Sequence, residues 1–278
     1  MGRPAKRNMK RILLSAFLIS TFLISSSLLA EPKKKSFQER FPSPEELAAI
    51  TERGRMMAEY DVAAWHATDV IQDLKPPAGS FRYYIAKKSD AGWVVVFGRL
   101  TEAHDKFLIV YQATQGTRSE FFTDKKYDPP LEDVDFYFAA AKAFDKALDD
   151  LGPVNRPYNS YAIPSTTGQL YVYLLPAQTT DGIYPLGADV RYTFTSDGNT
   201  MVEKRQMHKT VLEFDFRDSS AQGKKLEASW HTHVLSNVPE DSDVFYVLAR
   251  KPSIPEYVGT MDKKVWVINT DGTILLGK

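Results

Sequence analysis

The sequence predicts an α+β protein with mostly antiparallel sheets, a long N-terminal helix and a second, central helix. Apolar residues recur at helical spacing over residues 43–74 and 133–151, which predicts the two helices. Elsewhere, short runs of β-branched and aromatic residues alternate with turn-forming Gly, Asn and Asp residues, a pattern typical of strands joined by hairpins. Because most strands follow one another without an intervening helix, the pattern favours α+β over a doubly wound parallel sheet.

The N-terminus has the order of a secretory signal peptide. A start with five Lys and Arg residues precedes an apolar run over residues 12–24, and the chain becomes charged again at Glu31. We predict a signal peptide over residues 1–30 with cleavage after Ala30. The alternative is a retained anchor helix, for which the apolar run is short of the ~20 residues that a span needs. The mature protein is then expected to be periplasmic or secreted, with no stable membrane span.

Charge and composition narrow the classes of function. Loss of residues 1–30 removes five positive charges and no acid, so the formal net charge moves from +0 to −5. A mildly acidic chain has no basic surface able to neutralise several phosphates, which argues against nucleic acid as a partner. The chain has no cysteine, so disulfides, thiol catalysis and a lipid-modified cysteine are excluded. An exported chain of this length must therefore be held by its core.

Residues 31–42 form a charged linker, and the first helix follows it directly. Ser43 is suited to cap this helix, Pro44 suits its first turn, and Glu46 stands where a capping box requires an acid. The helix must end before Pro76, because a residue that precedes proline is disfavoured in helical geometry.

The rest of the segment 43–151 predicts a three-strand antiparallel meander and the second helix. Pro129-Pro130 suggests a boundary between the two, and the helix over residues 133–151 ends at Gly152. The predicted strands of the meander are Phe81–Ala86, Trp93–Leu100 and Lys106–Thr114.

The segment 152–278 is rich in strand patterns, and it forms either a separate module or one domain with segment 43–151. Ser196-Asp197-Gly198-Asn199 predicts a hairpin turn, since Gly and Asn tolerate positive φ. Val244–Arg250 fits a strand by composition and a helix by the cap that Ser242 offers. The predicted strands are Leu170–Leu175, Val190–Thr195, Thr200–Arg205, Val211–Phe216, Leu226–Val234, Tyr257–Thr260 and Val265–Asn269.

The most informative motif is Trp230-His231-Thr232-His233, followed ten residues later by Asp243. Side chains alternate along a strand, so His231 and His233 point to the same side. Two imidazoles and a carboxylate can supply three ligands of a zinc ion, with the fourth position open to water, which would support hydrolysis. The alternative interpretation is an ordinary half-buried strand, with Trp230 facing the core and both histidines facing solvent.

This motif resembles the signature of the JAMM/MPN-type zinc isopeptidases and of a related JAB-like module at the ends of bacterial secreted toxins. In that family His-X-His lies on a strand, and an aspartate follows at the turn that begins a helix. The resemblance covers residues 155–276 at most, and its sharp part is Trp230–Asp243. It implies His231, His233 and Asp243 as the zinc ligands.

The chain departs from the family pattern in two respects. Glu240 stands where the family keeps a serine, and no glutamate lies between Gly152 and Val202, where the family carries the general base for the zinc-bound water. Glu203 and Glu213 are the candidates that remain for a base. His208 lies in the basic segment Lys204–Lys209, which is expected to be a solvated surface.

Two functions follow from these observations. The missing base favours an exported, non-catalytic binding or accessory protein with a degenerate JAB-like module and a protein or peptide partner. The ligand spacing favours a zinc-dependent peptidase or amidase that uses His231, His233 and Asp243, with Glu203 or Glu213 as base. Zinc is the one cofactor that the sequence suggests in either case.

Overall fold

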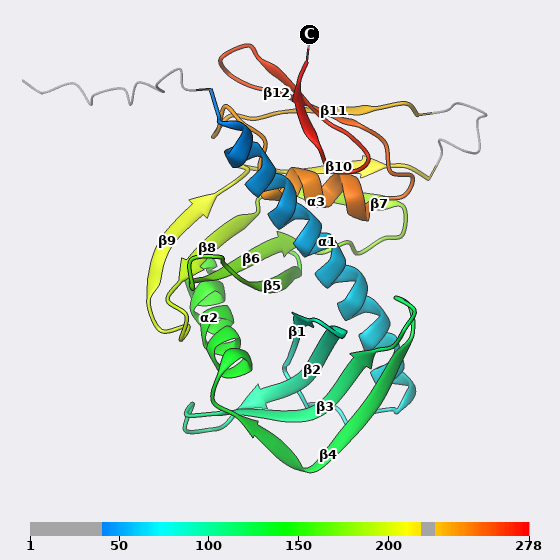
Figure 1. The fold of residues 1–278 in the computed structure, drawn as a ribbon, viewed down its shortest axis with the longest axis vertical. Coiled ribbons are helices and arrows are strands. Elements are labelled where there is room, and N and C mark those ends of the chain that lie inside the picture. The colour runs from blue at the N-terminus through cyan, green and yellow to red at the C-terminus, as the bar shows by residue number, and fades with distance from the viewer. Residues whose placement is uncertain (1–40, 218–225, 278) are drawn as a thin grey trace, which may run out of the picture. The chain divides into compact units, whose positions relative to one another are not determined.

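A computed structural model of the chain describes residues 41–217 and 226–277, and within these ranges it contains three helices and fourteen strands (Figure 1). The predicted signal peptide over residues 1–30 and most of the linker over 31–42 lie outside the described residues. No helix within the described ranges is both long and apolar enough to cross a membrane. The α+β class and the predominance of antiparallel pairing are confirmed.

The elements in chain order are α1 (Pro44–Asp73), β1 (Tyr83–Ser89), β2 (Gly92–Leu100), β3 (Phe107–Gln115), β4 (Phe122–Asp133), α2 (Phe136–Leu151), β5 (Tyr158–Pro164), β6 (Leu170–Pro176), β7 (Ile183–Gly187), β8 (Val190–Phe194), β9 (Met201–Gln206), β10 (Val211–Asp215), β11 (Ser229–Thr232), α3 (Asp241–Ala249), β12 (Glu256–Gly259), β13 (Val265–Ile268) and β14 (Ile274–Leu276).

Helix α1 begins as the sequence predicts. The Ser43 hydroxyl accepts a hydrogen bond from the Glu46 backbone N–H at 3.2 Å, and the Glu46 carboxylate accepts one from the Ser43 N–H at 2.8 Å. These reciprocal bonds satisfy two of the N–H groups that a helix start leaves unpaired. The helix then buries one side along its length, including Met57, Tyr60 and Ile71, so it can pack against the sheets.

The meander is confirmed, but it has a fourth strand that the sequence did not predict. The sheet has the order β1-β2-β3-β4, all antiparallel. Pro129-Pro130 was expected to mark a boundary, and this expectation was wrong, because both prolines lie within β4. Strand β4 is at the edge of the sheet, where a missing N–H costs no ladder bond, and the pairing shifts register between Ile109 and Tyr111.

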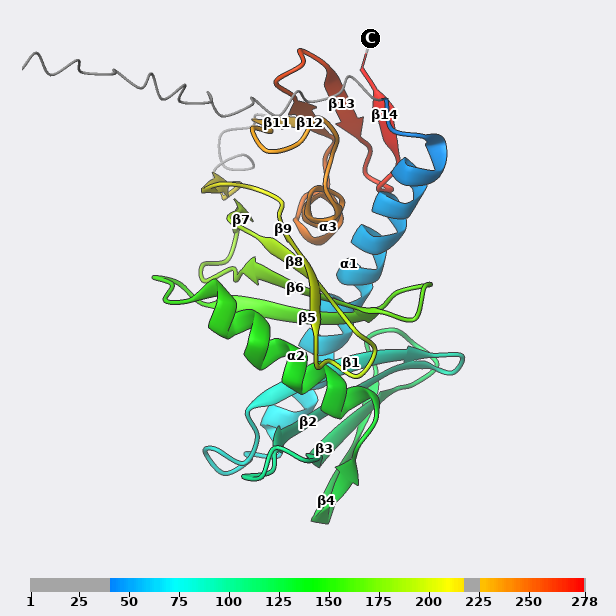
Figure 2. The ribbon, with the colours of Figure 1, turned by 90° about the vertical axis from the view of Figure 1, so that its left-hand side faces the viewer.

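The second antiparallel sheet, with the order β5-β6-β8-β9, separates two apolar cores. Alternate residues of β6 serve each core: Val172 and Leu174 pack with residues of α2, whereas Tyr173 and Leu175 pack with residues of α1. Helices α2 and α3 lie on opposite sides of this sheet (Figure 2). Because both cores draw on segments 43–151 and 152–278, residues 41–278 form one unit.

The C-terminal sheet has the order β11-β12-β13-β14, and its β11–β12 pair is parallel. The ambiguous segment Val244–Arg250 belongs to helix α3. Val244 and Val247 are buried and pack with Val258 and Trp266 of this sheet, because residues three apart share one side of a helix. Helix α3 also packs along α1, so it lies between the C-terminal sheet and the rest of the molecule (Figure 1).

Candidate metal centre

Four buried side chains from three separate segments converge on one point. They are His208, His231, His233 and Asp243, and one ligand atom from each lies within 4.8 Å of the others. The imidazole Nε2 atoms of His208 and His231 are each 3.1 Å from Asp243 Oδ1, and the Nε2 atom of His233 is 3.1 Å from Asp243 Oδ2. The three residues that the sequence singled out as ligands are therefore brought together, with a fourth.

Strand β11 presents its histidines to the interior. The alternation that places His231 and His233 on the same side is correct, and both residues are buried. The alternative interpretation, with histidines in solvent and Trp230 in the core, is wrong: Trp230 is 50% exposed and His231 is 3% exposed. Trp230 stacks instead on Tyr257 of the neighbouring strand at the surface, which leaves the histidine side of β11 to face α3.

Asp243 is fixed by the start of α3. Its Oδ2 atom accepts a hydrogen bond from the Glu240 backbone N–H at 2.6 Å, which forms one half of a capping box. The Oδ1 atom of Asp243 and the Nε2 atom of His231 are both buried, and neither has a hydrogen-bond partner among the described residues. The helix start therefore aims a carboxylate at the histidines and leaves one of its oxygens without a donor.

His208 is the site residue that the sequence analysis missed. The expectation of a solvated surface was wrong, because His208 is only 8% exposed and its Nε2 atom lies 2.8 Å from Nε2 of His233. The residue follows β9, where the buried Met207 anchors the chain next to the Ser242 hydroxyl at the start of α3. No local signal identifies His208, since its basic neighbours resemble a surface segment and the other three residues of the centre are at least 23 residues away.

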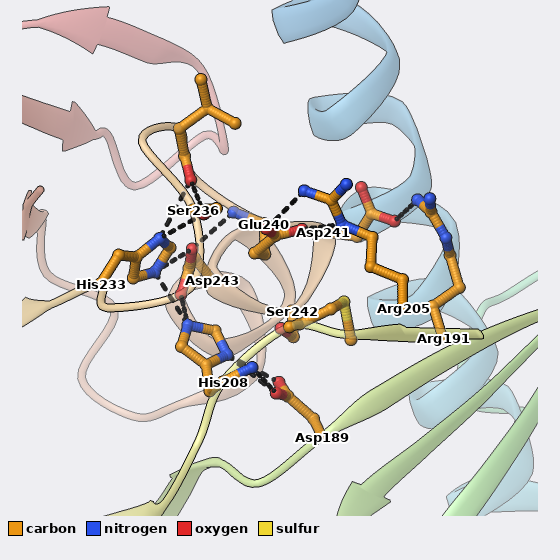
Figure 3. Close-up of polar contacts among 12 residues, drawn as sticks. Asp189, Arg191, Arg205, His208, His233, Ser236, Glu240, Asp241, Ser242 and Asp243 are labelled. Atoms are coloured by element: carbon orange, nitrogen blue, oxygen red, sulfur yellow. Dashed lines mark hydrogen bonds and ion pairs between the residues drawn. The ribbon is translucent and has the colours of Figure 1, made fainter. Parts of the chain in front are cut away.

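Each histidine binds an acceptor through the nitrogen that faces away from the centre. Figure 3 shows His208, His233 and Asp243 pointing toward one another, with Asp189 on the far side of His208. The outward contacts are His208 Nδ1 to Asp189 at 2.8 Å, His231 Nδ1 to Glu256 at 2.8 Å, and His233 Nδ1 to the Val238 carbonyl oxygen at 2.9 Å. Because a carbonyl or an ionised carboxylate can only accept, each Nδ1 carries the proton. With the proton on Nδ1, Nε2 is the nitrogen that faces the centre, where it can carry a second proton or bind a metal ion.

The charge balance of the centre calls for a cation. The Nε2 atoms of His208 and His233 are 2.8 Å apart, and their lone pairs would repel each other unless a proton or a metal ion lies between the two nitrogens. Without a metal, burial lowers the pKa of His208, but Asp189 and Asp243 hold that pKa well above its usual value. Burial likewise lowers the pKa of His231, but Asp243 and Glu256 raise it to about 9. The acidic surroundings thus favour positive charge at this point, and the four groups could hold a metal ion.

Glu256 is itself held in place by a buried arginine. Its Oε2 atom accepts a hydrogen bond from Arg250 Nη1 at 2.6 Å, and both side chains are inaccessible to solvent. Arg250 also donates to the Ile254 carbonyl oxygen at 2.6 Å. This arrangement fixes the ring of His231 from behind, as the outer-sphere carboxylates of metal sites do.

Neither glutamate considered as a base joins the centre. Glu203, on β9, is 54% exposed at its side chain and lies 3.9 Å from Arg191. Glu213, on β10, is 55% exposed and pairs with Arg156 at 3.1 Å. Glu240, where the JAMM/MPN pattern has serine, pairs with Arg205 at 2.6 Å. All three carboxylates therefore have partners outside the group of four.

The comparisons with known proteins add no relative. No family model matches the chain, and neither a curated protein nor a solved structure matches it. The resemblance to the JAMM/MPN-type isopeptidases therefore stays a prediction that depends on the motif Trp230–Asp243.

Proposed function

We propose that this protein is an exported, non-catalytic binding or accessory protein with a structural zinc ion, held by His208, His231, His233 and Asp243. The observation that carries the proposal is the convergence of four buried side chains on one point. In addition, the Nδ1 atom of each of the three imidazoles contacts a hydrogen-bond acceptor outside the group of four. The ion would join β11, the segment after β9 and the start of α3. In a chain without cysteine, such a cross-link takes the role that disulfides have in many exported proteins.

The donor set favours zinc over other common ions. Three imidazole nitrogens and one carboxylate oxygen match the ligands and the fourfold coordination of zinc. Calcium and magnesium prefer six or more oxygen ligands, and this centre offers one carboxylate. Copper and nickel also bind imidazole, so metal content must be measured together with affinity.

Four protein donors favour a structural role over hydrolysis. Catalytic zinc sites have three protein ligands and keep the fourth position for water, whereas here His208 would take the fourth position around a bound zinc ion. The other acids of the centre, Asp189 and Glu256, are bound to imidazole Nδ1 atoms. Among residues 41–217 and 226–277 we identify no base placed to activate a water molecule. Such a base would supply about 10²–10⁴-fold in rate. The peptidase alternative therefore has less support than the structural role.

Metal content and affinity test the proposal. The mature protein, purified without chelator, should contain about one zinc ion per chain by plasma mass spectrometry. His208→Ala should weaken zinc binding strongly, whereas His66→Ala, which changes a histidine on α1, should leave it unchanged. Unaltered zinc affinity in His208→Ala would mean three protein ligands and an open position, and would favour the peptidase.

A further inference from the structure

A small cavity, whose lining includes none of the four proposed ligands, lies at the junction of five elements. It has a volume of about 80 Å³ and is lined by residues of α1, β5, β6, β7 and α3. Its lining includes Asp61, Asn159, Tyr161, Tyr184, Phe245 and Tyr246. The exposed Gln178 is also among the lining residues, so the cavity is reachable from solvent.

Asp61 is a carboxylate without a cation. Its one hydrogen bond comes from the Tyr161 hydroxyl at 2.8 Å, and no ion pair joins it to a basic side chain among the described residues. Burial raises its pKa, and the Tyr161 hydrogen bond opposes that rise only in part. Carboxylates withdrawn from water are ordinarily paired, as the buried Asp241 is with Arg53 and Arg191, whereas Asp61 is half-buried and has no such pair among the described residues. The unpaired Asp61 on the wall of a cavity therefore points to a cationic ligand from outside.

The other walls identify the class of cation. Tyr161, Tyr184 and Phe245 are among the lining residues, and aromatic rings attract ammonium groups through their negative faces. A metal ion such as calcium needs several oxygen ligands, and one carboxylate cannot supply them. A volume of about 80 Å³ holds an alkylammonium end, while the rest of the ligand stays outside.

We propose that this cavity is a binding site for a primary ammonium group, which pairs with Asp61 and packs against the rings of Tyr161, Tyr184 and Phe245. The group can belong to a small alkylamine or to a lysine side chain of a peptide. This site is separate from the proposed zinc centre, and it does not depend on zinc being bound.

Titration of the mature protein with propylammonium chloride, followed by NMR shifts of backbone amides in β5 and α3, tests the proposal. We expect saturable binding with a dissociation constant on the order of 1 mM. Propanol, which has the same shape without the charge, should bind at least about tenfold more weakly. Sodium chloride at the same ionic strength should cause no such shifts.

Two variants assign the site. Asp61→Asn keeps the size of the side chain and removes its charge, so propylammonium should bind at least about tenfold more weakly. Asp69→Asn, which changes an exposed acid of the same helix, should bind as the parent does. Tyr184→Leu keeps the charge and removes a ring, and should weaken binding less than Asp61→Asn does.

Three results would overturn the proposal: no saturable binding to the parent protein, equal binding of propanol, or parent-like binding in folded Asp61→Asn. Melting temperature and zinc content of each variant show whether it is folded, so a failure here is distinct from a failure of the zinc proposal. Titration with Nα-acetyl-lysine amide distinguishes a lysine side chain of a peptide from a small alkylamine as the ligand. Tighter binding than propylammonium indicates a peptide lysine, and weaker binding indicates a small amine; either result upholds an ammonium site.

Discussion

Two carboxylates in the first turn of α3 are equally buried and are satisfied in different ways. Asp241 and Asp243 are both 0% exposed. Asp241 accepts hydrogen bonds from Arg53 at 2.8 and 2.9 Å, from Arg191 at 2.8 Å and from the Tyr173 hydroxyl at 2.9 Å. Asp243 has three imidazole Nε2 atoms at 3.1 Å in the corresponding places.

The difference lies in where the positive charge comes from. Arginine is always protonated, so Asp241 has permanent cations from within the chain. Around Asp243 the positive charge comes either from protonated imidazoles, since the pKa values of His208 and His231 are raised, or from a metal ion that displaces those protons. A buried acid with fixed cationic donors is complete, whereas a buried acid among histidines can exchange protons for a metal ion. Figure 3 shows part of each arrangement, with Asp241 beside Arg191 and Asp243 beside His208 and His233.

The largest expected effect is the loss of the ion from the centre. Asp243→Asn removes the charged ligand, so the protein should be purified with almost no zinc. Zinc in excess should then raise the melting temperature of the parent and leave the variant unchanged; at a hundredfold excess over the dissociation constant the stabilisation is about 2.7 kcal/mol. Calorimetry with added zinc or chelator measures this. A variant that keeps parent-like zinc affinity would contradict the assignment of Asp243.

Asp241→Asn should give the opposite result. It leaves Arg53 without a carboxylate and Arg191 with only the exposed Glu203 at 3.9 Å, so the free energy of unfolding should fall by about 3–5 kcal/mol. Zinc content should remain at the parent level in the folded protein. Urea denaturation and metal analysis of the same samples test both statements. Loss of zinc from folded Asp241→Asn would show that the two carboxylates do not act independently.

A smaller effect on zinc affinity is expected from Glu256, which contacts the ligand His231 from outside the centre. Glu256→Gln keeps a side chain of the same shape beside His231 but removes the charge that orients its ring, so zinc affinity should fall about 10–100-fold. Competition with a chromogenic chelator measures the change. Glu227→Gln, at an exposed position near β11, is the matched control and should bind zinc as the parent does.

Zinc binding should also depend on pH. In the metal-free protein the pKa of His231 is raised from 6.5 to about 9, because Asp243 and Glu256 outweigh the effect of burial. This raised pKa stabilises the metal-free fold below pH 6.5, and that contribution is lost as the pH rises through about 9. Zinc must displace the proton, so its affinity should increase over the same range. An affinity independent of pH would mean that His231 is not a ligand.

The smallest expected effect lies far from both carboxylates. Ser43→Ala removes the cap of α1 and should lower the free energy of unfolding by about 1 kcal/mol, with zinc content unchanged. A thermal melt of the variant gives the comparison. An unaltered midpoint would mean that packing fixes the start of α1 without the cap.

Local patterns predicted helices α1 and α2 and most of the meander, and they left the segment of α3 open between strand and helix. Ser43, Pro44 and Glu46 mark the start of α1 because a capping box is made by neighbours in sequence. Strand β4 was missed because Pro129-Pro130 usually ends a strand, and only its place at a sheet edge makes the prolines tolerable.

The site was predicted where it depends on one strand and one turn. The alternation along β11 places His231 beside His233, and the helix start after Pro239 supplies Asp243. His208, Asp189 and Glu256 could not be predicted, because they reach the centre through long-range packing of β9, β8 and β12. The sequence also could not predict that the histidine side of β11 is buried, since this depends on which element covers that strand.

The most direct test of the account is zinc-edge X-ray spectroscopy and anomalous diffraction on the mature protein. The account predicts one zinc ion among His208, His231, His233 and Asp243, with nitrogen and oxygen ligands at about 2.0–2.1 Å. A folded protein that binds no metal at this point, or one in which His208 stays unbound while water completes the coordination, would contradict it.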